Sequence, residues 1–369
     1  MRKGWEYKSF ETCINKLPKP KQVKTSEYSS GTKYPIISQE DKLISGYYDD
    51  ESYVFHIDSP VVIFGDHTRV LKYVDFDFVV GADGVKIISP KRELNAKFLL
   101  YYLQWYKIPN LGYSRHYKLL KEIKIPLPPK STQLAIVFEL DKINELIRLK
   151  KEQLKDFDNL AQSLFYEMFG DPVENEKGWE VKKLGELLKV IGGYAFKSDK
   201  YKDEGIPILR IGNINSGFFR DTNLVFAESD EKLERYKIFP GDIVISLTGT
   251  VGKSDYGNVC IMDDAYNFYY LNQRNAKLEI FGNLDKYYLS AILKNEVIKS
   301  RLTSISRGVR QANIANKDIE NLQIPLPPLS LQRLFAQRIE QIDREKSEVQ
   351  KSIQDLETLL ASRMQYWFE

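Results

Sequence analysis

The sequence predicts an α+β protein of two globular domains joined by two long helices, which form an antiparallel coiled coil within an internal pseudo-twofold repeat. Three observations predict this fold. Short motifs occur twice, each copy ends in a long heptad-patterned segment, and the segments between alternate strand-like runs with glycine turns. The length of 369 residues exceeds one typical domain. With 43% apolar and 28% charged residues, the composition excludes a disordered chain.

The internal repeat is defined by two pairs of matching motifs. The sequence Gly-Trp-Glu at residues 4–6 recurs at residues 178–180. The sequence Ile-Pro-Leu-Pro-Pro at residues 125–129 recurs at residues 324–328, and a serine and then a glutamine follow each copy. The two pairs are offset by different distances, so the second copy is longer between its motifs. The chain is therefore a duplication with two unequal segments and two closely matched tails.

Each tail is predicted to be a long helix. The proline pairs exclude helix upstream, and Ser131 and Ser330 are the expected N-caps. Apolar residues then alternate at spacings of four and three over about five heptads, which specifies a coiled coil. Lys150 and Lys346 interrupt the two seams. Each helix of about 37 residues spans about 55 Å. Its seam packs either against the other helix or against a partner subunit.

These signals divide the chain into five parts. Gly170 is a typical residue for a helix C-terminus, and Pro172 prevents the helix from continuing. Strand-like runs and short helical segments predict mixed α and β structure in the globular parts. The parts are a first globular domain at residues 1–130, a first helix at 131–170, a linker at 171–177, a second globular domain at 178–329 and a second helix at 330–369.

The patterns that mark common catalytic sites are missing from the sequence. The Gly-Lys-Ser at residues 252–254 lacks the glycine spacing of a phosphate-binding loop. Three histidines and two cysteines form no zinc-binding pattern. We therefore expect no catalytic residue, metal or cofactor in this chain. One alternative is a metal-dependent nuclease that uses Asp66, Asp75 and Asp77, although acidic residues at strand ends more often form turns.

Local charge and cysteine content give two weaker indications. Residues 1–130 carry 21 Lys and Arg against 15 Asp and Glu, although the net charge of the whole chain is only +3. Such an excess suits either phosphate contact or a solvated lysine-rich loop. Cys13 and Cys260 lie in opposite halves and indicate no disulfide framework. No apolar run is long enough to span a bilayer, so the expected compartment is the reducing cytoplasm.

An ordered set of motifs in the second half points to a known family. The motifs are KLGE at residues 183–186, GYAFKS at 193–198, IPILRIGNI at 206–214, GDIVIS at 241–246, GTVGK at 249–253 and GVRQ at 308–311. With the duplication and the heptad tails, this set resembles the specificity (S) subunit of type I restriction–modification systems over essentially the whole chain. The first half departs more, because FGDHTR at residues 64–69 stands where the second half has its loop at 246–252.

The resemblance implies a DNA-recognition subunit that is not itself an enzyme. Each globular domain would be a target-recognition domain that reads one half of a bipartite site in double-stranded DNA, and the helix pair would set the spacer. Two methyltransferase (M) subunits would dock along the helices and supply S-adenosylmethionine chemistry. Restriction/translocase (R) subunits would add ATP- and Mg²⁺-dependent cleavage. None of these cofactors is expected in this chain, and no membrane is involved.

Base reading requires polar or cationic side chains that can enter a groove, with further cations on the phosphates. The candidates lie in loops marked by glycines, where side chains can vary without disturbing a core. In the first domain they are Lys21, Lys24, His67, Thr68, Arg69, Arg115 and His116. In the second domain they are Lys197, Ser198, Arg220, Thr248, Thr250, Lys253, Arg307, Arg310 and Gln311. A further alternative is a coiled-coil scaffold whose globular ends bind proteins.

Overall fold

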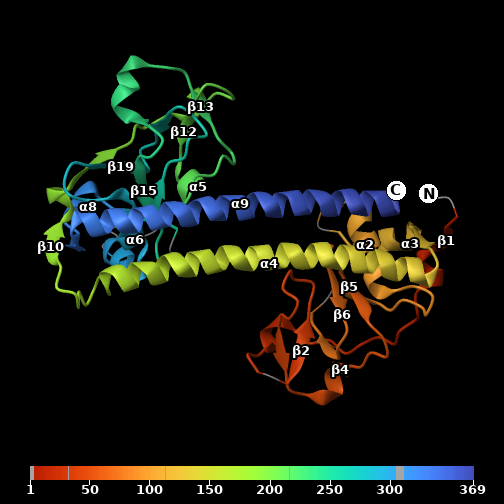
Figure 1. The fold of residues 1–369 in the computed structure, drawn as a ribbon. Coiled ribbons are helices and arrows are strands. Elements are labelled where there is room, and N and C mark those ends of the chain that lie inside the picture. Colours follow the sequence, from red (N-terminus) through yellow and green to blue (C-terminus); the bar gives the residue numbers. More distant parts are fainter. Residues whose placement is uncertain are drawn as a thin grey trace. The chain divides into compact units, whose positions relative to one another are not determined.

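The computed structural model describes residues 4–31, 33–82, 84–112, 114–215, 217–253, 255–304 and 311–369. The chain forms two compact units, one of Met1–Gln153 with Val349–Glu369 and the other of Leu154–Glu348. Each unit therefore combines one globular part with portions of both long helices, α4 (Lys130–Phe169) and α9 (Leu329–Phe368) (Figure 1). Within the described residues, no helix is both long and apolar enough to cross a membrane.

The globular part of the first unit contains two larger sheets and the antiparallel pair β1-β9. Its strands are β1 (Glu6–Ser9), β2 (Tyr34–Ile37), β3 (Gly46–Tyr48), β4 (Val54–Phe55), β5 (Val61–Gly65), β6 (Leu71–Val74), β7 (Phe78–Val80), β8 (Val85–Ile88) and β9 (Lys124–Leu127). Its helices are α1 (Phe10–Cys13), α2 (Ala96–Tyr106) and α3 (Tyr117–Glu122). The sheet β6-β5-β8 lies nearer to α4, and the sheet β3-β2-β7-β4 lies farther from it (Figure 1).

Strand β5, at the centre of the sheet β6-β5-β8, faces a different apolar core on each side. Val62 and Phe64 belong to the apolar core that also contains Ile136 and Leu140 of α4. Their neighbours along the strand belong to a different core, which is shared with β2 and β7 of the outer sheet. This alternation is the expected pattern of a strand that is buried on both faces. It explains why residues 61–65 are uniformly buried and apart from glycine entirely apolar.

The globular part of the second unit repeats this arrangement with additional elements. Its strands are β10 (Glu180–Lys183), β11 (Leu188–Gly192), β12 (Ile206–Leu209), β13 (Phe226–Ala227), β14 (Lys237–Ile238), β15 (Ile243–Ser246), β16 (Thr248–Thr250), β17 (Val259–Ile261), β18 (Tyr269–Leu271), β19 (Asn275–Ile280), β20 (Gln311–Asn313) and β21 (Gln323–Leu326). Its helices are α5 (Ile211–Ile214), α6 (Lys286–Lys294), α7 (Glu296–Thr303) and α8 (Asn316–Glu320).

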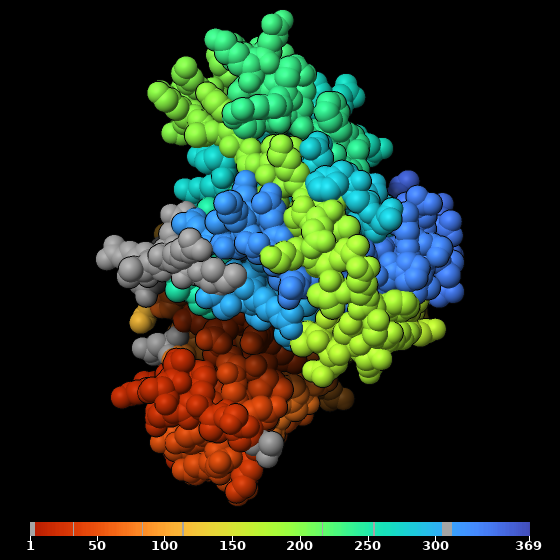
Figure 2. Space-filling view, turned by 90° about the vertical axis from the view of Figure 1, so that its left-hand side faces the viewer, coloured from red at the N-terminus to blue at the C-terminus, as the bar shows by residue number. Residues whose placement is uncertain are grey.

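The strand orders of the two globular parts confirm the duplication predicted from the motifs. The outer sheets β3-β2-β7-β4 and β13-β12-β18-β14 each contain one parallel pair flanked by two antiparallel pairs. The central strand β15 pairs with β17 and β19 as β5 pairs with β6 and β8. Figure 1 and Figure 2 show that the longer loop between α5 and β14, coloured green, forms the end of the second globular part farthest from α9.

The long helices run antiparallel to each other within each unit, as the sequence predicts. In the first unit Glu139 of α4 contacts Arg363 of α9, and Lys151 pairs with Glu357 at 2.8 Å. The positions on α9 therefore decrease as those on α4 increase. In the second unit, Asp158 pairs with Lys346 at 2.5 Å, while Phe165 packs on Phe335 with ring centroids 5.9 Å apart. The half-buried Lys346, which interrupts the apolar seam, thus has a carboxylate partner across the helix pair.

The end of α4 is capped by the chain that follows it. Gly170 has a φ of +77°, and its N–H donates to the carbonyl of Tyr166 at 2.8 Å, which is the left-handed cap expected of glycine at this position. The indole N–H of Trp179 donates to the carbonyl of Phe169 at 2.8 Å. Lys177 also donates to two of the last carbonyls of the helix. The repeated Gly-Trp motif thus closes a helix end in the second unit.

Candidate nucleic-acid interface

In the first domain, the chain that leaves the central strand β5 is held against the segment before α3. The carbonyl of Asp66 accepts hydrogen bonds from the backbone N–H of His116 and from its Nδ1, both at 2.9 Å. The Nε2 of the same ring accepts from the N–H of Leu111 at 3.0 Å. His116 is fully buried. Its ring therefore joins two loops of the domain and is not available at the surface in this conformation.

Residues 67–69 are held by two further segments. Gln39 accepts the N–H of His67 through its side-chain Oε1 at 3.3 Å and the hydroxyl of Thr68 through its carbonyl at 2.7 Å. The guanidinium of Arg69 donates to the carbonyl of Ile108 at 3.1 Å. Lys72, on the following strand β6, is buried and donates to the carbonyls of Ser38 and Lys42. Burial lowers the pKa of Lys72.

The second domain builds the corresponding loop as a short antiparallel ladder. Strand β16 pairs with β20, so that Thr248 lies opposite Asn313 and Thr250 opposite Gln311. The backbone N–H and the hydroxyl of Thr250 donate to the two oxygens of Asp255 at 2.8 and 2.9 Å. These hydrogen bonds, the backbone one first, hold the pKa of Asp255 below its usual range. The ladder joins the loop after β15 to the chain that follows residue 310.

The sequence candidates of the second domain are partly joined by this ladder. Thr248 and Thr250 belong to β16, and the exposed Lys253 follows them in the same loop. The backbone of Gln311 pairs with that of Thr250, so the two candidate segments of this domain meet. Arg307 and Arg310 lie outside the described residues.

A second set of candidates lies beside the outer sheet of each domain. Gln22 forms a parallel bridge to Val80 at the end of β7, and the exposed Lys21 and Lys24 flank it. In the second domain, Tyr194 forms a parallel bridge to Asn272 at the end of β18, shortly before Lys197 and Ser198. Because β7 and β18 hold the same place in the two outer sheets, the two domains carry these candidates at corresponding positions.

The remaining two candidates, Arg115 and Arg220, belong to neither set. Arg115 is exposed and directly precedes the buried His116. Arg220 is exposed in the loop after α5, and its guanidinium lies 5.0 Å from the ring centroid of Phe218. Apart from these two, the structure places most of the described candidates of each domain either in the loop after the central strand or in a segment beside the outer sheet.

Sequence reasoning missed the residues that hold the first loop in place and those that surround it. Gln39 and Lys72 carry no motif, and their roles arise from contacts with residues about 30 positions away in the chain. Lys107 lies beside Arg69 in an open pocket between the β5–β6 loop and the end of α2. The proline at position 109 marks the end of a helix in the sequence, but nothing there indicates which loop the helix end meets.

Two of the three aspartates of the nuclease alternative form separate sets of hydrogen bonds, and the third, Asp75, is exposed. Asp66 is buried and accepts the N–H of Tyr117 at 2.7 Å. Asp77 accepts from His56 at 2.6 Å and from the N–H of Ile57, and these hydrogen bonds, the one from Ile57 first, lower its pKa. In the described part of the chain, no three His, Cys, Asp or Glu residues are grouped so that they could bind a metal ion.

Comparisons with known proteins agree on one family. A family model described as "Type I restriction modification DNA specificity domain" matches residues 3–156 and 176–358. The chain is 27% identical over 268 residues to the type I restriction enzyme MjaVIII specificity subunit of Methanocaldococcus jannaschii, covering 66% of this chain and 62% of that protein. It is also 27% identical over 183 residues to the EcoKI specificity subunit of Escherichia coli (strain K12), covering 46% of this chain and 38% of that protein.

Solved structures show the same fold at lower identity. The type I restriction-modification S subunit from M. genitalium superposes with a TM-score of 0.59 at 18% identity, covering 98% of this chain and 95% of that one. A chain from a structural study of assembly and conformational transition in a type I R-M system superposes with a TM-score of 0.56 at 20% identity, covering 100% and 98%.

Proposed function

Since the chain belongs to the family of type I restriction modification DNA specificity domains, we propose that it is the DNA-recognition subunit of a type I restriction–modification complex. Each globular part reads one half of a bipartite target. The observation that carries this proposal is the pairing of a repeated scaffold with unlike loops. The outer sheets share one strand order, whereas the loop after β5 is a compact turn and the loop after β15 is a paired strand. Different loops on one scaffold are what two different half-sites require.

Exposed side chains of the two loop sets supply the contacts to DNA. Lysines and arginines neutralise phosphates, while threonine, serine and glutamine hydroxyls or amides can read base edges. The exposed candidates are Lys21, Lys24, Thr68 and Arg115 in the first domain, and Lys197, Ser198, Arg220, Thr250 and Lys253 in the second. Gln311 belongs to the β16–β20 ladder, Arg307 and Arg310 precede it closely in sequence, and the three residues complete the set.

The helix pair sets the spacer between the half-sites and binds the partner subunits. Each long helix is continuous over 40 residues. In the first unit, α4 exposes Leu134, Phe138, Leu146 and Leu149, of which Phe138 is 65% exposed. These apolar side chains are spaced by four, eight and three residues, which places them on one side of the helix, and they form a stripe that suits a protein partner. We assign this stripe to a methyltransferase subunit.

The chemistry of the complex belongs to its other subunits. Methyltransferase subunits bind S-adenosylmethionine and methylate adenine at N6, and restriction/translocase subunits use ATP and Mg²⁺ for cleavage. The chain described here supplies sequence recognition and holds these subunits on DNA. The missing catalytic patterns in the sequence support this division of labour.

DNA binding at several salt concentrations tests the proposal against a protein-binding scaffold. The chain, co-purified with the methyltransferase subunit of its own system, is titrated with duplex DNA between 50 and 200 mM salt. Phosphate contacts give a log–log slope of about −0.9 for each phosphate neutralised. A slope of several units supports recognition of DNA, whereas no salt-dependent DNA binding by the assembled complex contradicts it.

Replacing the exposed stripe on α4 tests the docking surface separately. Phe138→Glu is expected to abolish co-purification of the methyltransferase subunit, because it places a charge in the centre of the stripe. Arg148→Glu is the matched control on an exposed polar part of the same helix. Retention of the partner by the Phe138 variant would exclude this surface.

A further inference from the structure

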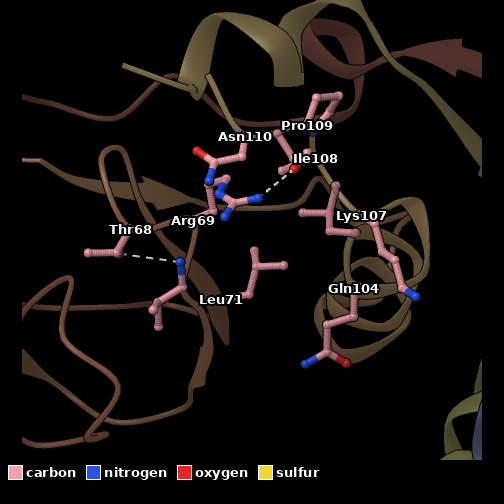
Figure 3. A pocket seen from close by; sticks show the side chains of 10 residues that line it. Thr68, Arg69, Leu71, Gln104, Lys107, Ile108, Pro109 and Asn110 are labelled. Atoms are coloured by element: carbon pink, nitrogen blue, oxygen red, sulfur yellow. Dashed lines mark hydrogen bonds between the residues drawn. The ribbon is translucent and has the colours of Figure 1, made fainter. Parts of the chain in front are cut away.

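An open pocket in the first domain contains two cations. It lies between the turn that joins β5 to β6 and the C-terminal end of α2, and its volume is about 600 Å³. Arg69 points across it toward Ile108, and Lys107 and Gln104 extend from the end of α2 at its other side (Figure 3). Leu71 and Leu103 line the apolar part of the wall. None of the ten described residues that line the pocket is acidic.

Both cationic residues of the pocket have a backbone conformation that their side chains disfavour. Arg69 has a φ of +63° and Lys107 a φ of +49°. In the described part of the chain, only two other non-glycine residues have a positive φ, and both are asparagines, which tolerate this region. Such a conformation costs a residue other than glycine or asparagine about 1 kcal/mol or more. In Lys107 it forms the left-handed C-cap that ends α2. The strain is thus concentrated at the two charges of one pocket.

Arg69 lines the pocket and makes one hydrogen bond through its guanidinium with the described residues. A guanidinium carries five N–H donors, and the hydrogen bond that the described residues offer it is the one to the carbonyl of Ile108 at 3.1 Å. That bond fixes the direction of the side chain. The carbonyls at the end of α2 carry partial negative charge, and the ammonium of the exposed Lys107 offsets it. Exposed Asn110 adds a side-chain amide at the mouth.

We propose that this pocket binds a phosphodiester group of the DNA backbone beside the half-site that the first domain reads. The proposal rests on the proposed function and names Arg69 and Lys107 as the two phosphate ligands. An anion fits a pocket that is lined by two cationic side chains and by no acidic one among the described residues. A base edge fits less well, because Arg69 is half-buried and tied to a carbonyl, whereas base reading in the major groove needs a protruding side chain.

The test compares substitutions that remove each charge without adding strain. Arg69→Asn and Lys107→Asn place asparagine where φ is positive, so that the loop conformation is retained. Each variant, assembled with the methyltransferase subunit, is titrated with two duplexes: one carries the target mapped by methylation, and the other has both half-sites scrambled. Lys351→Gln on the exposed face of α9 is the control, and Arg69→Lys keeps the charge.

Loss of one phosphate contact makes the log–log salt slope shallower by about 0.9. Between 50 and 200 mM salt, the factor by which affinity falls should therefore be about 3.5 times smaller for each asparagine variant than for the wild type. The loss of affinity is expected to be equal on both duplexes, and Arg69→Lys restores the slope. Single methylphosphonate substitutions in the DNA should weaken the wild type at one position without affecting Arg69→Asn.

Two results would overturn the inference while leaving the proposed function intact. One is a wild-type slope in both asparagine variants. The other is an unchanged slope with lost discrimination at one base pair, which would make Arg69 a base-reading residue. A wild-type complex that binds both duplexes without preference and without salt dependence would contradict the proposed function as well as the inference.

Discussion

Gln133 and Gln332 have the same role in the two repeats. Each is buried just inside a long helix. The side-chain oxygen of Gln332 accepts the N–H of Asp285, the N-cap residue of α6, at 2.8 Å, and its amide donates to the carbonyls of Pro327 and Asn283. Gln133 forms the same three kinds of hydrogen bond with the chain around α2. One side chain therefore fixes the start of each long helix to the short helix of its globular part.

Replacing either glutamine with leucine should destabilise the unit that contains it. Leucine keeps the apolar bulk but leaves a buried N–H and two carbonyls without partners. The expected loss is about 2 kcal/mol in the free energy of unfolding. Urea denaturation of Gln332→Leu measures it, with Gln337→Leu on the exposed face of α9 as the control. Equal midpoints for the two variants would mean that the hydrogen bonds contribute nothing net.

Glu139 gives the stability of the first unit a defined pH dependence. Its carboxylate accepts from Arg363 and from the indole N–H of Trp367, and the bond from Arg363 is the main cause that holds the pKa of Glu139 below its usual range. A lowered folded-state pKa stabilises the fold above the unfolded value near 4.5. This contribution is lost as the pH falls through the folded-state value.

The substitution Glu139→Gln should therefore cost about 1 kcal/mol at pH 7, because the pair is partly exposed. The difference from the wild type should shrink as the pH falls below 4.5. Urea midpoints from pH 7 to pH 3 measure this, with Glu348→Gln at an exposed site of α9 as the control. A difference that grows toward acid pH would contradict the assignment.

At the residue scale, the sequence names candidate side chains for the interface but does not indicate their burial or their contacts. Arg69 and His116 both come from loops that were expected to be surface loops. The structure shows His116 buried between two loops and Arg69 tied to Ile108. Such contacts join residues about 40 or 50 positions apart, and no local pattern encodes them. Lys107 was missed for the same reason.

Among the elements, the long helices were the most predictable, because their heptad seams extend over many turns. Their antiparallel pairing is confirmed within each unit. The seam alone does not indicate where a helix ends against a globular part. Phe368 of α9 packs among Phe98, Tyr102 and Trp105 of α2 in the first unit. Phe169 of α4 packs on Tyr288 of α6 in the second unit.

The aromatic end of α9 should therefore stabilise the first globular part, although the two are far apart in sequence. Phe368 is 4% exposed, and truncating a buried phenylalanine costs about 3–5 kcal/mol. Phe368→Ala should lower the urea midpoint and speed hydrogen exchange in β1 and β9. Leu359→Ala, at a site 45% exposed on the same helix, serves as the control. Unchanged exchange in the first unit would show that its core does not depend on α9.

The helix pair can be shortened to test its role in spacing. Deleting residues 148–154 and 349–355 removes one heptad from each antiparallel partner and keeps both seams in phase. Seven residues correspond to about 10 Å of helix, or about three base pairs of DNA. The tolerated spacer should shorten while both half-site sequences stay the same. An unchanged spacer in the methylated target would limit the helices to a docking role.

At the scale of the whole molecule, the duplication explains both what is shared and what differs. Three features recur in the two units. They are the strand order of the outer sheet, the buried glutamine that binds the N-cap region of a short helix, and the packing of a long helix's C-terminal phenylalanine on that short helix. The loops after β5 and β15 differ in both sequence and structure. Burial constrains the shared elements, so their pattern is visible in the sequence. The contacts that hold the loops differ between the two units and follow no repeated pattern, so the sequence does not indicate which bases the loops read.

Methylation mapping tests the central claim most directly. The chain is co-expressed with the methyltransferase subunit of its own system in a host without DNA methylation, and the DNA is sequenced by a method that detects N6-methyladenine. Two domains that read separate half-sites predict one split motif with a gap of fixed length. Methylation at a single continuous motif, or no methylation by a soluble, assembled complex, would contradict the account.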